Sequence, residues 1–320
     1  MTTTLNNDSN VNNNFKALLE RLEAFQEKQL FFLGGIIKSG TTWIERLLDA
    51  HPEIACKGEA HFPSLLEPSL RSGIAQYNAV IPKKGNWARL QKEGVQDILP
   101  MEYGFVHHDL DDILALSIQL LMCKWFDVES IKAVGEKTPN NAQHFQQLLR
   151  LFPKAKFIYV VRDIRDVIVS GWFFNITLDP KGALEHFGDM HQYGVHMAKI
   201  WVEDIARGMK FIEQNNKQAL MIKYEELWHK PQDITRRLLQ FVNVTDTDDL
   251  INTCLHYTNF SRLSGGRERG SENRASFYRK GVIGDWRNHL DNDTLVEIEM
   301  HCGALMDRLG YSRDSIESSN

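Results

Sequence analysis

The chain has 320 residues, of which 42% are hydrophobic and 25% are charged, and its formal net charge is −5. This composition predicts a globular protein whose core needs no disulfide or metal, and it argues against a broad nucleic-acid surface. The four cysteines are scattered without a C-x-x-C pair, which predicts a reducing, cytoplasmic location. No apolar run approaches the length of a membrane span, so no membrane partner is expected.

The first half of the chain begins with an asparagine-rich stretch, residues 1–14, that predicts a disordered tail without a secretory signal. Apolar residues then recur at helical spacing over 15–28, and a short apolar run bounded by glycine, 30–37, predicts a buried strand. Further helices are expected over 41–50 and 110–126.

The second half repeats this strand-then-helix pattern. A strand is expected over 157–161 and another over 219–227, and residues 313–320 are predicted as a C-terminal tail. Strands that alternate with helices predict an α/β fold, a single domain over 15–312 with a central parallel sheet of about four or five strands flanked by helices. The helices of this half are expected over 163–174, 195–213, 231–241 and 294–308.

The run KSGTT, residues 38–42, joins the first strand to the helix that follows it. Such a junction offers unpaired amide groups and the positive end of a helix dipole, and both favour an anion. Gly35 and Gly40 have the glycine spacing of a nucleotide P-loop, but Thr41 stands where that motif has its lysine. The sequence therefore predicts a P-loop-like turn in which Lys38 contacts a bridging or transferred group; the alternative is an ordinary glycine turn.

Residues 33–62, with KSGTTW followed by DAHPEIACKGEAHF, resemble the 5′-phosphosulfate loop of sulfotransferases that use 3′-phosphoadenylyl sulfate. The resemblance implies that Lys38 contacts the phosphosulfate and steadies the leaving phosphate, and that Trp43 stacks on adenine. It also implies that the 5′-phosphate is bound by Ser39, Gly40, Thr41 and Thr42.

Two later segments resemble the elements of this family that bind the 3′-phosphate. In RDIRDVIVSGWFF, 162–174, the resemblance implies that Arg162 and Ser170 grip that phosphate, and the planar fork of arginine suits the role. FYRKGVIGDWRNHL, 277–290, is similar to the C-terminal R-K-G-x-x-G-D-W segment, which implies that a loop closes over the phosphate through Arg279, Lys280 and Gly281. The adenine pocket would be completed by Tyr224, Thr258 and Phe260.

Transfer of a sulfuryl group to a hydroxyl needs a base that removes the proton. Cytosolic members of the family use the histidine of a K-T-H motif, but VGEKTPNN keeps Lys137 and has Pro139 at the histidine position. The run KGEAHF resembles a glutamate segment of carbohydrate and tyrosyl-protein sulfotransferases, which makes Glu59 the preferred base and leaves Lys137 to assist the sulfuryl group. The second candidate is His61, because imidazole titrates near neutrality. Less favoured candidates are Glu136 and His144.

The resemblance covers about residues 31–290 and implies transfer from 3′-phosphoadenylyl sulfate to a hydroxyl, with release of adenosine 3′,5′-bisphosphate and no metal. The expected acceptor is a small molecule or a carrier-bound metabolite, held in a partly apolar pocket. That pocket is expected to involve residues 60–126 and 175–200 and the aromatic run Trp172, Phe173 and Phe174.

Two alternatives to this function remain at the level of sequence. One is a P-loop kinase that uses ATP and magnesium, for which Asp163 is the candidate ligand. The other is a silent nucleotide-binding protein, because the usual histidine is missing. The dimer signature K-x-x-x-T-V-x-x-x-E of many cytosolic members is not found, which leaves the oligomeric state open.

Overall fold

The computed structural model describes residues 5–84, 92–94, 104–126 and 129–313. The chain forms two compact units. The larger comprises Lys28–Ala60, Val128–Gln146 and Lys154–Asn320, and the smaller comprises Met1–Glu27, His61–Asp127 and Gln147–Pro153.

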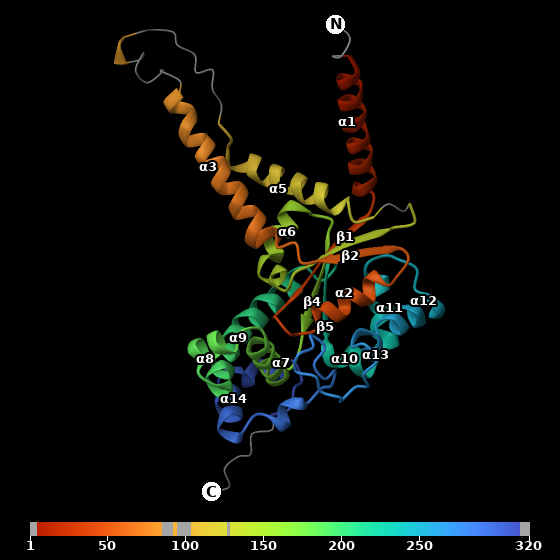
Figure 1. Cartoon of the computed structure of the whole chain (residues 1–320), viewed down its shortest axis with the longest axis vertical. Helices are drawn as coiled ribbons and strands as arrows, with labels where there is room; N and C mark the ends of the chain where they lie inside the picture. Colours follow the sequence, from red (N-terminus) through yellow and green to blue (C-terminus); the bar gives the residue numbers. More distant parts are fainter. Residues whose placement is uncertain (1–4, 85–91, 95–103, 127–128, 314–320) are drawn as a thin grey trace. The chain divides into compact units, whose positions relative to one another are not determined.

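A parallel sheet forms the centre of the larger unit (Figure 1). Within the described residues it has five strands in the order β2-β3-β1-β4-β5. The prediction of an α/β fold with a parallel sheet is confirmed. The strands are β1 (Gln29–Gly35), β2 (Ile54–Gly58), β3 (Ala133–Lys137), β4 (Lys156–Val161) and β5 (Ala219–Lys223). The sequence pattern missed β2 and β3, because each has only five residues and ends in glycine or charged side chains.

One face of the sheet is covered by α2 (Thr41–Asp49), α10 (Tyr224–His229), α11 (Pro231–Phe241) and α12 (Asp248–Tyr257). Alternate strand residues such as Leu33, Ile158 and Ile222 point to this face and pack with Leu47 and Leu238 of the helices. Because both faces of a parallel sheet are buried, the intervening strand residues must find a second apolar layer.

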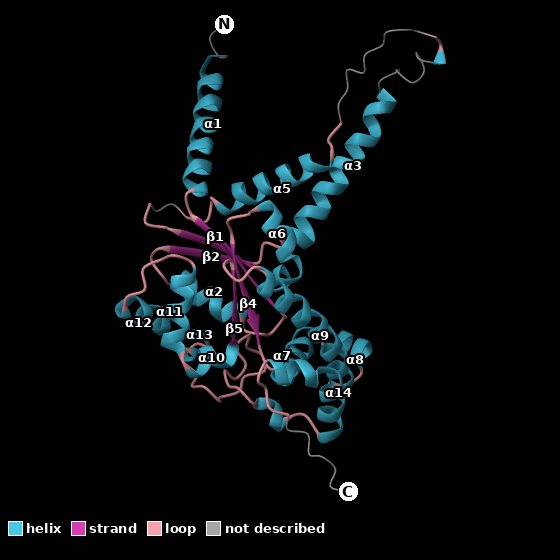
Figure 2. Cartoon of the chain, turned by 180° about the vertical axis from the view of Figure 1, so that it is seen from behind, coloured by secondary structure: helices cyan, strands magenta, loops and turns pink. Residues whose placement is uncertain are grey.

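That second layer is aromatic. Phe157 of β4 packs against Phe145 and Phe211 with ring centroids 5.1 Å apart in both pairs, and Tyr159 donates a hydrogen bond to the Asp204 carbonyl. Helix α9 (Met190–Gln214), which carries Asp204 and Phe211, lies on this face. Three helices pack beside it (Figure 2), namely α7 (Ile164–Leu178), α8 (Pro180–Phe187) and α14 (Asn292–Arg308). Shorter elements of the unit are η2 (Pro139–His144), α13 (Phe260–Leu263) and η3 (Asp285–Asn288). The helix α6 (Phe145–Leu151) begins in this unit, and its residues from Gln147 onward belong to the smaller one.

The smaller unit is helical. It contains α1 (Leu5–Gln26), η1 (Phe62–Leu66), α3 (Glu67–Lys84) and α5 (His107–Met122). Phe62 stacks on Trp125 with ring centroids 6.3 Å apart, and Arg21 donates a hydrogen bond to the Cys123 carbonyl at 2.9 Å. No helix in the described ranges is long and apolar enough to cross a bilayer.

Several predicted boundaries differ from the structure. Residues 5–14 belong to α1 rather than to a disordered tail, because no proline or glycine interrupts the chain before the helix ends at Gln26. The strand expected over 219–227 stops at Lys223, and Tyr224 begins α10. Helix α9 begins at Met190, where the Asp189 side chain caps it by accepting a hydrogen bond from the Gln192 amide.

Candidate active site

The carboxyl ends of all five described strands deliver side chains to one edge of the sheet. Lys38 follows β1, Glu59 follows β2, Lys137 ends β3, Arg162 follows β4 and Tyr224 follows β5. Strand β1 is hydrogen-bonded to β3 on one side and to β4 on the other, so the chain order reverses there. Ligands of open parallel sheets bind in the crevice at such a reversal.

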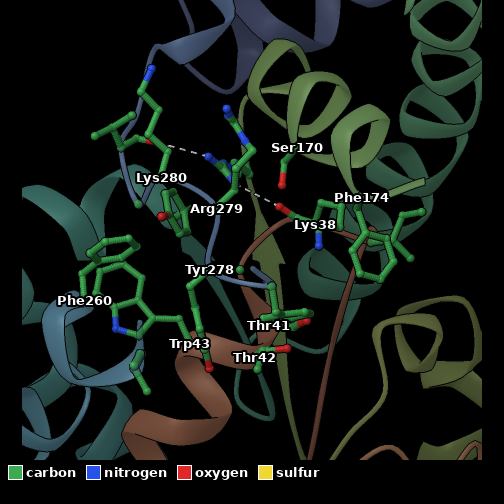
Figure 3. A pocket seen from close by; sticks show the side chains of 18 of the residues that line it. Lys38, Thr41, Thr42, Trp43, Ser170, Phe174, Phe260, Tyr278, Arg279 and Lys280 are labelled. Carbon is green, nitrogen blue, oxygen red and sulfur yellow. Dashed lines mark hydrogen bonds between the residues drawn. The ribbon is translucent and has the colours of Figure 1, made fainter. Parts of the chain in front are cut away.

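A cavity of about 280 Å³ lies at this edge. Figure 3 shows Lys38 beside Phe174, and Trp43 and Phe260 across the same pocket. Most of the residues predicted to bind the donor line this cavity, together with Glu59. They are Lys38, Gly40, Thr41, Thr42, Trp43, Arg162, Ser170, Tyr224, Thr258, Phe260, Arg279, Lys280 and Gly281. Ser39 is not among them and is fully buried beneath the turn.

The turn before α2 has an unusual backbone that the sequence explains. Gly40 has φ 96° and Lys38 has φ 66°, both in the left-handed region. A side chain at Gly40 would place its Cβ 2.4 Å from the Tyr224 ring, so only glycine fits. The Lys38 carbonyl accepts a hydrogen bond from Arg162 Nη1 at 3.1 Å, which ties the turn to the end of β4.

The Lys38 ammonium has aromatic neighbours instead of a carboxylate. Its Nζ lies 3.9 Å from the centre of the Phe174 ring and 4.6 Å from that of Phe277. Among the described residues no carboxylate is within ion-pair distance of it. Burial, assisted by the charges of Arg162 and Arg279, lowers the pKa of Lys38 to about 8. Such a cation gains most from an anion that enters the cavity.

Arg162 is the second cation at this edge. Its guanidinium lies 4.2 Å from the centre of the Tyr224 ring and donates to the Val282 carbonyl at 3.3 Å. Two buried polar atoms nearby, Arg162 Nε and Ser39 Oγ, have no hydrogen-bond partner in the described chain. Buried polar groups are rarely left unsatisfied, so Arg162, which lines the cavity, is expected to pair through Nε with an oxygen of a bound anion.

Two aspartates, Asp166 of α7 and Asp285 within the segment itself, hold residues 277–290 in place. Asp166 of α7 accepts hydrogen bonds from the amides of Gly284 at 2.7 Å and Trp286 at 3.2 Å. Asp285 binds Lys280 at 2.6 Å and also pairs with Arg279. Partial burial opposes these bonds, yet they hold the pKa of Asp285 well below its usual range. Arg279 and Lys280 are thereby held where they line the cavity.

The aromatic side of the cavity is formed by residues far apart in sequence. Trp43 meets Tyr224 edge-on with ring centroids 5.4 Å apart, and Thr258 donates to the Cys254 carbonyl at 2.7 Å. Gly281 has φ 68°, and a Cβ there would lie 2.2 Å from the Phe260 ring. The sequence reasoning missed the lining residues Ile37, Leu263, Arg269, Phe277, Tyr278 and Val282. Of these, Phe277, Tyr278 and Val282 lie in the segment 277–290 that resembles the family's C-terminal element.

The carboxylates at the strand ends have different surroundings. Glu59 lines the cavity, and its Oε1 lies 2.6 Å from Lys137 Nζ. Glu136 is fully buried, which raises its pKa, and it accepts hydrogen bonds from the Ala60 amide, Thr138 and Asn141. It therefore acts as an anchor of the β2 loop instead of a base. Of the other two candidate bases, His144 is half-buried in η2 and does not line the cavity, and His61 precedes η1 in the smaller unit.

Two sequence hypotheses change in the light of these contacts. Asp163, the candidate magnesium ligand of a kinase, caps α7 and binds the Arg165 guanidinium through both oxygens at 3.0 and 2.7 Å. Trp172 was expected near the acceptor, but it is 9% exposed and packs against Tyr193 of α9. Within the described ranges, no three His, Cys, Asp or Glu side chains are grouped to hold a metal ion.

Comparison with known proteins decides the family. The sequence model described as "Sulfotransferase family" matches residues 31–249. The chain belongs to the sulfotransferase family. This agrees with the resemblance carried by KSGTTW and RKGVIGDW, and it establishes the chain as a transferase of sulfuryl groups.

Relatives of this sulfotransferase fall into two groups. Protein-tyrosine sulfotransferase 2 of Gallus gallus is 25% identical over 89% of this chain and 70% of its own length. Protein-tyrosine sulfotransferase of Drosophila melanogaster is 26% identical over 89% of this chain and 52% of its own length. Sulfotransferase 2A1 of Homo sapiens is 31% identical, but over only 44% of this chain and 55% of its own length.

The fold of this sulfotransferase is also found in a solved structure. A crystal structure of mouse sulfotransferase SULT7A1 complexed with PAP covers 90% of this chain and 88% of its own, with a TM-score of 0.52 and 18% identity. At this identity the likeness concerns the fold alone. It agrees with the parallel sheet flanked by helices that is described above.

Proposed function

We propose that this sulfotransferase uses 3′-phosphoadenylyl sulfate as donor and releases adenosine 3′,5′-bisphosphate. The proposal rests on one observation: a single cavity gathers the cations Lys38, Arg162, Arg279 and Lys280 together with aromatic lining residues. We assign the 5′-phosphosulfate to Lys38 and the turn before α2, and the 3′-phosphate to Arg162, Arg279 and Lys280. A nucleotide with phosphates on both its 5′- and 3′-oxygens matches that charge pattern, and a 5′-phosphate alone does not.

The residues suit an in-line transfer in which Glu59 acts on the acceptor. The acceptor hydroxyl gives its proton to a Glu59 oxygen while its own oxygen forms a bond to sulfur. The bond from sulfur to the 5′-phosphate oxygen breaks, and the charge that develops on that phosphate is stabilised by Lys38 and by the amides at the start of α2. The ammonium of Lys137, 2.6 Å from Glu59, orients the carboxylate.

The acceptor that we propose is a phenolic hydroxyl, with tyrosine in a peptide as the first candidate. Relatives aligned over 89% of this chain are named protein-tyrosine sulfotransferases, whereas Sulfotransferase 2A1 aligns over 44%. This choice departs from the small-molecule or carrier-bound acceptor expected from the sequence. A second cavity of about 220 Å³ supports an aromatic acceptor, because it shares Lys38 with the first and is lined by Phe173, Phe174 and Phe277.

The donor assignment is tested by calorimetry with three nucleotides. Adenosine 3′,5′-bisphosphate is expected to bind at least about 100-fold more tightly than AMP, because AMP leaves Arg162, Arg279 and Lys280 without an anion, and charged hydrogen bonds contribute about 1.5–3 kcal/mol each. ATP with magnesium serves as the kinase comparison. Equal affinity for the bisphosphate and AMP would overturn the donor assignment, and tighter binding of magnesium ATP would support a kinase.

The affinity for adenosine 3′,5′-bisphosphate is expected to depend on pH through Lys38. With a pKa of about 8 in the free protein, Lys38 is charged below pH 8 and loses its charge as the pH rises further. Because the bound phosphate favours the charged lysine, the affinity should fall above pH 8 by up to about tenfold per pH unit. Titrations at pH 6.5 to 9.5 measure this, and Lys38→Met should abolish the slope. A flat profile in the unmodified protein would contradict the prediction.

A further inference from the structure

Lys137 lies between two carboxylates that belong to different elements. Its Nζ is 2.6 Å from Glu59 Oε1 and 3.3 Å from Glu45 Oε2. It is also 3.3 Å from Thr42 Oγ1, so each of its three donors faces an oxygen. Glu59 lines the cavity and its side chain is 38% exposed, whereas Glu45 is 7% exposed and does not line the described cavity.

The position of Glu45 is unfavourable for donor binding. A carboxylate taken out of water costs several kcal/mol unless it is paired, and its negative charge opposes the phosphates of a nucleotide. Glu45 projects from α2, which directly follows the turn that carries Lys38. In the part of the chain that the structure describes, Glu45 forms its ion pair with Lys137, and the contact with this ammonium compensates its burial.

Glu45 has a clear effect at the moment of proton transfer. When Glu59 accepts a proton it becomes neutral, and it no longer compensates the buried Lys137 ammonium. Without Glu45 an isolated buried charge would result, which is strongly unfavourable. With Glu45 in place, Lys137 keeps a carboxylate partner at 3.3 Å before and after the transfer. Because Lys137 also faces Glu45, its ammonium stabilises the charged form of Glu59 less than it would if Glu45 were absent.

We propose that Glu45 is a positioning residue that holds the Lys137 ammonium while Glu59 takes the proton of the acceptor hydroxyl. The inference rests on the proposed function and extends it to a residue outside the cavity. In this step the proton moves to Glu59, the new bond joins the acceptor oxygen to sulfur, and Lys137 keeps its proton and its pair with Glu45.

Several other titratable groups lie around Glu45, Lys137 and Glu59. Cys56 is buried close to Glu45, which raises its pKa, and burial also raises the pKa of Tyr278, which faces Glu45, Lys137 and Arg46. Both groups therefore titrate on the alkaline side, as does Lys38 with its pKa of about 8. Asp49 is bound to the exposed Lys57, and Glu136 is bound to Ala60, Thr138 and Asn141.

The test uses Glu45→Gln in the full chain, with 3′-phosphoadenylyl sulfate as donor and a tyrosine peptide as acceptor, whose phenol titrates near pH 10. The kcat should fall by about tenfold to 100-fold, part of the roughly 10²–10⁴-fold that a general base contributes. The acid limb of the pH–rate profile should move to lower pH by about one unit, because Lys137 then loses one of its two ion-pair partners and interacts more strongly with Glu59. The KM for the donor and the affinity for adenosine 3′,5′-bisphosphate should stay within about twofold of the unmodified protein.

Three further variants separate positioning from general destabilisation. In a Lys137→Met background, Glu45→Gln should change kcat by less than about twofold, because the residue acts through Lys137. Glu45→Asp keeps the charge and should leave the acid limb where it is. Glu299→Gln removes a different buried carboxylate, one that pairs with Arg165, and should lower the melting temperature without moving the limb.

The possible outcomes distinguish this inference from the proposed function. If the unmodified protein transfers sulfate from the donor and Glu45→Gln leaves kcat and the acid limb unchanged, the inference fails and the proposed function stands. If no transfer occurs to the tyrosine peptide or to 2-naphthol, the proposed function itself fails. Should Glu45→Gln not fold, Glu45→Asp decides: with a carboxylate kept at this position the acid limb should stay where it is, and a limb moved to lower pH by about one unit overturns the positioning role.

Discussion

Replacing Lys38 with alanine is expected to lower the turnover of 3′-phosphoadenylyl sulfate by at least about 10³-fold. One preorganised donor aimed at developing charge contributes about 10²–10³-fold, and Lys38 supplies a full charge in a water-poor cavity. Its ammonium lies over the rings of Phe174 and Phe277, and the charge of Glu59 acts on it less strongly than burial and the two nearby arginines do. Affinity for adenosine 3′,5′-bisphosphate should fall too, because the 5′-phosphate loses a cation.

The measurement is a steady-state assay of bisphosphate release, paired with calorimetry. Lys181→Ala is the matched control, because this lysine is 84% exposed and pairs only with Glu185 on α8. The control should retain full turnover. If Lys38→Ala kept both turnover and nucleotide affinity, the turn before α2 would not be the phosphosulfate site.

Replacing Glu59 with glutamine is expected to lower kcat by about 10²–10⁴-fold while the affinity for adenosine 3′,5′-bisphosphate stays unchanged. Glutamine has the same shape and can still contact Lys137, which lies 2.6 Å from Glu59, but it cannot accept the proton of the acceptor. A lower kcat with unchanged nucleotide affinity is the informative result, because a misfolded turn would lower both quantities.

The control for this substitution is Glu185→Gln, which changes an exposed carboxylate on the surface of α8. A Glu59→Gln variant with near-normal kcat would exclude Glu59 as the base. His61 would then be examined by His61→Ala, whose loss of turnover would move the role to that residue.

The phosphate-binding parts could be predicted because they are local. Residues 38–43 lie together in any structure in which β1 runs into α2. Arg162 lies just before α7 and Ser170 lies within that helix, so these two residues are also close along the chain. Backbone geometry in these segments follows from glycine positions and helix periodicity. The resemblance to a known family then linked the segments to one nucleotide, and the cavity brings them together.

Parts of the site that depend on long-range pairing could not be predicted. The Glu45–Lys137–Glu59 cluster exists because β3 pairs with β2 in a register that places Lys137 beside Gly58. Nothing in the run IERLLD, 44–49, marks Glu45 as more than a surface residue of a helix. The exclusion of Asp163 from metal binding likewise required the position of the Arg165 side chain.

The sequence by itself determined the class of the fold, the anion-binding turn and the family, because each of these depends on residues that are neighbours along the chain. The tertiary structure decided which carboxylates share the buried lysine, which aromatic rings surround Lys38 and which aspartates hold Arg279 and Lys280 in place. The physical reason is that charges and rings interact over a few ångströms of space. Such distances between remote residues are set only when the strands pair and the C-terminal segment folds over their ends.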